Sequence, residues 1–68
     1  MTVWKCKDNV VFSYKSTALA YSVALGLAKD EYVAEVCSIE VVNEHRFAPM
    51  GLFRGELLFR LVGLESGG

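Results

Sequence analysis

Residues 18–28, with the sequence ALAYSVALGLA, are the feature that most constrains the fold, because they are typical of a helix with almost no polar face. A helix that is apolar all round must be covered on more than one side. A chain of 68 residues has little material for that covering. The run therefore favours a partner protein, a second copy of the chain, or a membrane.

The run is too short to cross a bilayer, since its eleven residues fall well below the roughly twenty that spanning requires. It could instead be the apolar part of a secretory signal peptide, preceded by basic residues and cut after Ala28. Strand-like alternation before the run argues against that interpretation. Cleavage would also leave only about forty residues, too few for a self-sufficient core. We therefore expect a helix inside a small domain, with no membrane contact.

The composition indicates one globular domain, with 53% hydrophobic and 12% aromatic residues. Its net charge of -1 provides no global field that would attract nucleic acid or an anionic bilayer. Two cysteines, Cys6 and Cys37, lack the paired spacing of a zinc site or a redox motif. We expect reduced thiols in a cytoplasmic protein; a single disulfide between neighbouring strands is the alternative.

The N-terminal half predicts a β-hairpin followed by the apolar helix. Residues 2–6 and 10–14 alternate as strands, and Lys7, Asp8 and Asn9 supply a turn, since Asp and Asn tolerate the left-handed backbone of tight hairpins. Trp4 and Cys6 should share the apolar face of an amphipathic hairpin. Ser16 or Thr17 can cap a helix that runs to about Asp30.

The expected helix has two apolar faces. Its core stripe should hold Leu19, Val23 and Leu27 with two alanines, at the helical spacing of three to four residues. A second face then has no evident cover within the chain, which makes it a candidate seam for a homodimer or a partner. Gly26 weakens a helix interior and suggests that another backbone passes close to it. The seam residues are Tyr21, Leu25 and Ala28.

The C-terminal half predicts two further strands. Residues 32–42 alternate with period two and are rich in β-branched side chains, residues 43–51 contain Pro49 and Gly51 and should form a loop, and residues 52–64 alternate again. We expect the last two strands to pair. The fold is then α+β: a four-stranded antiparallel sheet with one helix packed on a face, in the order ββαββ. Residues 1–64 form the single domain, and residues 65–68 form a mobile tail.

Nothing in the sequence predicts catalysis, a cofactor or a metal site. His45 is the only histidine, and a nucleophilic arrangement with Cys37 and Glu44 has no supporting spacing. We place Cys37 on the apolar side of its strand, where a thiol is inert. One histidine and two separated cysteines do not supply four clustered metal ligands. We therefore expect a protein that is not an enzyme.

The predicted loop is the strongest candidate contact surface, because it combines aromatic residues, methionine and arginine, which are enriched at protein interfaces. Phe47 and Met50 could instead fold back and close the end of the core. A third interpretation is nucleic-acid binding, with aromatic rings stacking on bases and Arg46, Arg54 and Arg60 contacting phosphates; interleaved glutamates oppose it. The candidate partner-binding residues are His45, Arg46, Phe47, Met50, Phe53 and Arg54.

Residues 10–14, 16–20 and 36–42, a strand, the start of an Ala-rich helix and an IEVV-type strand, resemble the layout of small phage-encoded inhibitors, namely anti-CRISPR proteins and inhibitors of host RNA polymerase. The resemblance covers about half of the chain and rests on hydrophobic pattern. It implies a non-enzymatic protein, acting in the host cytoplasm, that blocks a host protein complex by occupying a surface. It assigns no functional residue. A small nucleic-acid-binding regulator is the alternative function.

Overall fold

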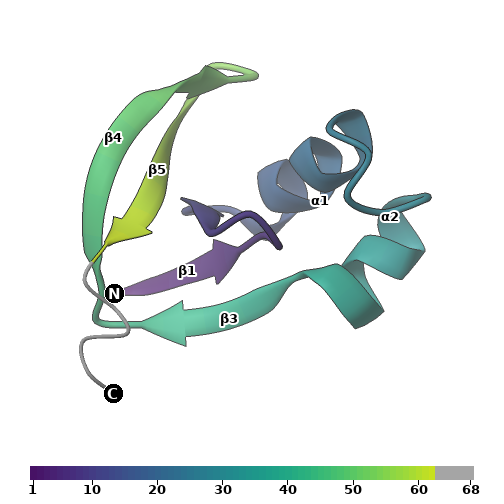
Figure 1. The fold of residues 1–68 in the computed structure, drawn as a ribbon, viewed down its shortest axis with the longest axis horizontal. Helices are drawn as coiled ribbons and strands as arrows, with labels where there is room; N and C mark the ends of the chain where they lie inside the picture. Colours follow the sequence, from purple (N-terminus) through teal and green to yellow (C-terminus); the bar gives the residue numbers. More distant parts are fainter. Residues whose placement is uncertain (63–68) are drawn as a thin grey trace.

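The computed structural model describes residues 1–62, and within them it contains one five-stranded antiparallel sheet and three helical segments. The strand order is β3-β1-β2-β5-β4 (Figure 1). The predicted α+β class is confirmed, although the sheet has one strand more than expected; the proposed domain end at residue 64 and the tail 65–68 lie outside the described residues. The elements are β1 (Thr2–Lys5), β2 (Val10–Phe12), α1 (Lys15–Ala24), α2 (Glu31–Val33), the π-helical turn η1 (Ala34–Ser38), β3 (Glu40–Asn43), β4 (Arg46–Phe53) and β5 (Glu56–Val62).

The predicted N-terminal hairpin is confirmed, with its second strand ending at Phe12. Asn9 takes the left-handed backbone conformation that a tight turn needs, at φ 71°. The Asp8 carboxylate accepts a hydrogen bond from the Val10 backbone N–H at 3.2 Å. The backbone N–H of Cys6 donates to the Val10 carbonyl at 2.8 Å, which closes the hairpin.

Helix α1 is shorter than predicted because Gly26 terminates it. Gly26 has φ 77°, its N–H donates to the Val23 carbonyl at 3.1 Å, and the Leu27 N–H donates to the Ser22 carbonyl at 2.8 Å. These two bonds form a Schellman motif, which ends a helix at a left-handed glycine. A Cβ at Gly26 would meet nothing within 4 Å, so the expected close backbone approach is absent there.

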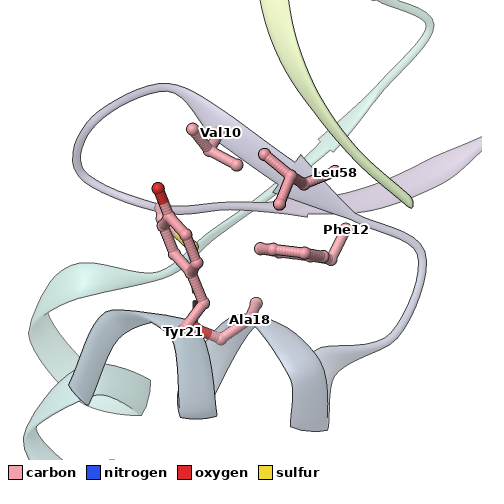
Figure 2. Packing of buried hydrophobic residues seen from close by; sticks show 6 residues of the cluster. Val10, Phe12, Ala18, Tyr21 and Leu58 are labelled. Atoms are coloured by element: carbon pink, nitrogen blue, oxygen red, sulfur yellow. Dashed lines mark hydrogen bonds between the residues drawn. The ribbon is translucent and has the colours of Figure 1, made fainter. Parts of the chain in front are cut away.

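The helix also packs on a different face from the one predicted. Ala18, Tyr21 and Ser22 are buried. Of the predicted stripe, Ala20 is also buried, whereas Leu19, Val23 and Leu27 are only half-buried. The Tyr21 ring packs on Phe12, with centroids 5.2 Å apart, beneath the sheet (Figure 2). Tyr21 is therefore a core residue.

Residues 32–38, predicted as the first part of a strand, are helical in the structure. The Asp30 carboxylate accepts from the Val33 N–H at 2.9 Å and so caps α2. Ala34 and Ser38, four residues apart, are both buried. The segment therefore follows a helical spacing here, although its sequence also fits the period-two pattern of a strand. The strand β3 begins only at Glu40, and it pairs with β1, not with the C-terminal strand.

The predicted loop at residues 43–51 is mostly strand. Arg46–Phe53 forms β4, which pairs with β5 around a turn at Arg54 and Gly55, with φ 53° and 79°. The final strand therefore starts at Glu56, not at residue 52. A bulge between Pro49 and Gly51 keeps the pairing in register despite the proline.

The sheet is coiled so that its two edge strands meet at one end. Only Glu44 and His45 separate β3 from β4, so the ends of these strands lie within about 11 Å. In a flat sheet of five strands the edges would be about 19 Å apart. Glu44 makes this tight corner at φ 56°, and Figure 1 shows β3 and β4 diverging from it.

The coiling gives the small sheet a core on both faces. The helix-side cluster contains Cys6, Val10, Phe12, Ala18, Tyr21 and Leu58. The second cluster lies on the opposite face and contains Val3, Val11 and Leu61, with Val42, Phe47 and Phe59 packed around them. The predicted amphipathic hairpin is therefore wrong: Val3 and Val11 are buried on the face that no helix covers, because the sheet closes over them.

Candidate functional site

The candidate site lies on the β4–β5 hairpin, whose face opposite the helix is entirely apolar. The register pairs three sets of residues across the two strands on this face. Their alternation places the charged residues of both strands on the other face or at the turn. The pairs are Phe47 with Leu61, Pro49 with Phe59, and Leu52 with Leu57.

Burial on this face falls from the base of the hairpin to its tip. Leu61 is buried in the second cluster, where the Phe47 and Phe59 rings pack 5.8 Å apart. At the tip, Leu52 is 66% exposed and Leu57 is 52% exposed. Met50, at the bulge, is half-exposed. We call Met50, Leu52 and Leu57 the tip surface.

The tip surface is held in place by an aromatic anchor on the opposite side of the hairpin. Phe53 packs edge-on against Tyr21, with centroids 5.3 Å apart at 88°, and lies 6.1 Å from Phe12. The Arg54 guanidinium stacks over the Phe53 ring at 5.8 Å, a cation–π contact. The hairpin therefore presents Leu52 and Leu57 from a packed base, with little conformational entropy to lose on binding.

The structure distributes the six predicted partner-binding residues along one strand. His45 precedes β4, and its ring lies 6.4 Å from Phe47. Phe47 and Phe53 face inward on opposite sides of the sheet. The core-closing alternative expected this of Phe47 and Met50, but Met50 is 50% exposed. Arg46, Met50 and Arg54 are exposed, and of these only Met50 belongs to the tip surface, since the Arg54 guanidinium lies over Phe53 on the other side of the hairpin.

Sequence reasoning missed Leu52 and Leu57 as contact candidates. Leu52 began the predicted strand 52–64, and Leu57 was placed on the apolar side of that strand. The available signal was the Arg54-Gly55 pair, since a glycine in a short polar interruption between alternating segments is typical of a hairpin turn. With the turn placed there, Leu52 and Leu57 lie opposite each other near the tip.

The predicted seam of Tyr21, Leu25 and Ala28 is not one surface. Tyr21 is in the core, Ala28 is half-buried, and Leu25 is 53% exposed. The Tyr21 hydroxyl donates to the Asp8 carboxylate at 2.8 Å. Burial, with this bond adding to it, raises the pKa of Tyr21 to about 12. The second face of the helix is thus covered in part by the chain's own sheet and hairpin.

The groups considered for chemistry are separated in the fold. Cys6 and Cys37 are both free thiols; Cys6 is buried, whereas Cys37 is exposed on η1 and not buried in a strand as predicted. Burial raises the pKa of the Cys6 thiol. Among residues 1–62, no three His, Cys, Asp or Glu side chains gather as metal ligands would.

Comparison with known proteins leaves the function open. No protein-family model, curated protein or solved structure matches this chain. Within the described residues no helix has the length and apolar character that crossing a membrane requires. The resemblance to small phage inhibitors therefore stays a prediction.

Proposed function

We propose that this chain is a non-enzymatic protein-binding module whose contact surface is the tip surface of the β4–β5 hairpin. The observation that carries the proposal is the exposure of Leu52 and Leu57, cross-strand neighbours on one face of a hairpin that is anchored by Phe53. Clustered exposed apolar side chains are typical of interaction sites. Met50 adds a residue type that is enriched at interfaces.

Binding through the side chains of this face is favoured over strand addition at the edge. The free edge of β4 contains Pro49, which has no backbone N–H to donate, and the bulge next to it. Both features interrupt the regular row of donors and acceptors that an added strand would need. The partner should therefore present an apolar surface to Leu52 and Leu57.

The proposed action is inhibition by surface occupation of a host protein complex, following the resemblance to phage-encoded inhibitors. The nucleic-acid alternative would need the three arginines of the hairpin to act together. Arg46 begins β4 and Arg54 follows its end. The Arg60 guanidinium donates to the Asp8 carbonyl at 2.9 Å, which ties it to the β1–β2 turn. This dispersal favours the protein-binding proposal.

The test is quantitative capture of proteins from a bacterial lysate by the tagged chain, by L52Q and by L25Q. Leu25 is a matched control because it has similar exposure and lies at the C-cap of α1, outside the tip surface. We expect the wild type and L25Q to enrich the same proteins, and L52Q to lose about tenfold in affinity for them. Equal enrichment by all three chains would refute the proposed surface. A steep linear fall of log affinity with log salt would instead indicate nucleic acid.

A further inference from the structure

The outer end of the β4–β5 hairpin extends past the strands that flank it. β2 pairs with β5 at Phe59 and Arg60, whereas residues 51–58 pair only with one another, across the turn, within the described part of the chain. In Figure 1 this turn, at the top of the view, projects beyond the other strands. A two-stranded hairpin by itself is marginally stable in water. Residues 51–58, which we call the outer hairpin, therefore depend on side-chain contacts with the rest of the molecule.

Two apolar side chains provide these contacts on the helix side. Phe53 packs edge-on against Tyr21, and Leu58 is buried in the helix-side cluster. The backbone of α1 lies against β1 and β2. The outer hairpin is thus attached to the helix mainly through Phe53 and Leu58, which is a small contact for a segment of this length.

A buried carboxylate opposes this attachment. Glu56 is the cross-strand partner of Phe53, and cross-strand partners lie on the same face of a sheet, so Glu56 also lies on the helix side. Both of its carboxylate oxygens are buried, and neither has a hydrogen-bond partner. Burying a charged group without a partner is unfavourable, and detachment of the outer hairpin returns this group to water. Phe53 and Glu56 therefore act in opposite directions on the attached form.

The backbone of the hairpin has two further weak points. Arg54 takes a left-handed conformation at φ 53°, at a turn position that favours Asn, Asp or Gly. Pro49 has no N–H to donate, and the bulge between Pro49 and Gly51 interrupts the regular pairing. The bulge also marks the inner limit of the weak segment, because Phe59, the partner of Pro49, already pairs with β2.

We propose that the outer hairpin detaches from the helix and unpairs as one cooperative unit while the rest of the fold stays intact, and that the unpartnered Glu56 carboxylate promotes this opening. The closed form is the major one. Opening exposes Phe53 and separates Leu52 from Leu57, so the tip surface exists only while the outer hairpin is closed. A partner bound to the tip surface then holds the hairpin closed. This consequence rests on the proposed function, whereas the opening itself does not.

The experiment is native-state amide hydrogen exchange, followed residue by residue by NMR at pH 7 with low concentrations of urea. It compares the protected amides of residues 51–58 with those of β1 and β2 in the wild type and three variants. Val11→Ala weakens the second cluster, which contains no residue of the outer hairpin. Glu56→Gln removes the buried charge, and Glu44→Gln makes the same chemical change at an exposed site outside the hairpin. Urea unfolding checks that each variant is folded.

In the wild type, the amides of the outer hairpin should be less protected than those of β1 and β2 and should respond less to urea, because partial opening exposes less surface than unfolding. Val11→Ala should speed exchange in β1 and β2 about thirtyfold and leave the outer hairpin unchanged, since Val11 stays packed in the open form. Glu56→Gln should slow exchange in both groups about fivefold, because opening and unfolding both release this side chain to water. Glu44→Gln should change neither group.

Two results would overturn the proposal. If the amides of the outer hairpin accelerated with Val11→Ala and had the urea dependence of global unfolding, the hairpin would not open separately. If Glu56→Gln left their exchange unchanged, the carboxylate would not promote the opening.

L52Q separates this proposal from the proposed function. Leu52 is exposed on the face away from the helix, so L52Q should lose lysate capture and yet open like the wild type. Glu56→Gln should keep capture, because the closed form already predominates in the wild type. An outer hairpin that opens only on global unfolding, with capture that still depends on Leu52, would overturn the inference and leave the proposed function standing.

Discussion

Replacing Tyr21 with phenylalanine tests whether the Tyr21–Asp8 hydrogen bond links the helix to the hairpin turn. The hydroxyl donates to the Asp8 carboxylate at 2.8 Å from a ring that is buried in the helix-side cluster. A hydrogen bond to a charged group contributes about 1.5–3 kcal/mol. Asp8 keeps its bond from the Val10 N–H, so the expected loss at pH 7 is at the lower end, about 1.5 kcal/mol.

The same bond predicts how stability changes with pH. The pKa of Tyr21 is raised to about 12 in the folded protein, against about 10 in the unfolded chain. Below pH 10 the hydroxyl is protonated in both states, and its contribution is complete. Between pH 10 and 12 the unfolded chain loses the proton first, so folding becomes less favourable. At pH 11 this loss is about 1.4 kcal/mol, and by pH 12 about 2–3 kcal/mol.

Urea unfolding followed by Trp4 fluorescence, at pH 7, 9, 10 and 11, measures both effects. The gap between the wild type and Tyr21→Phe should be about 1.5 kcal/mol at pH 7 and should shrink almost to zero by pH 11. All other groups are identical in the two chains, so their contributions cancel in the difference. Two stability curves that stay parallel from pH 7 to 11 would show that Tyr21 has no such linkage and would refute the argument.

Three further changes test the cores and the thiols. Val11→Ala should lower the free energy of unfolding in urea by about 2 kcal/mol, because Val11 is fully buried in the second cluster. The control Val41→Ala, at an exposed site, should change that free energy by no more than about 0.5 kcal/mol. Equal losses would contradict coverage of that face by the coiled sheet. Glu56→Gln should stabilise the fold by about 1 kcal/mol, because burying a charged carboxylate without a hydrogen-bond partner costs more than burying a neutral amide, and destabilisation in the same assay would refute this. Cys37 should react with a thiol reagent at once and Cys6 only on unfolding; two equally fast thiols would be inconsistent with the structure.

The parts of the fold that follow from local signals could be predicted from the sequence. The N-terminal hairpin was found because Asp8 and Asn9 form its turn and because alternation holds on both sides. The α+β class followed from one helical run among alternating segments. These features depend on residues that are close together in the sequence, so the hydrophobic pattern indicates them directly.

The parts that depend on distant contacts were predicted wrongly. The phase of α1 was wrong because its alanines and leucines are distributed all round, and the sheet selected Tyr21 through Phe12 and Phe53. The end of α1 was missed because Gly26 was taken for a packing residue and not for a cap. Pro49 concealed β4, since a proline is compatible with a strand only at an edge, and the sheet order decides which strand is an edge.

The candidate site was also predicted only in part from local signals. Residues 45–54 were chosen for their unusual composition, but dividing their side chains into inward and outward ones required the register of β4 on β5. That register places Phe47 and Phe53 inside and leaves Leu52 and Leu57 exposed at the tip.

The capture experiment with L52Q and the matched L25Q tests the central claim most directly, because both chains lose one leucine of similar exposure. The account predicts that proteins enriched by the wild type are retained by L25Q and are reduced about tenfold with L52Q, while urea unfolding shows that both variants are as stable as the wild type within about 0.5 kcal/mol. Enrichment that is identical for L52Q and the wild type would contradict the assignment of the hairpin tip as the binding surface.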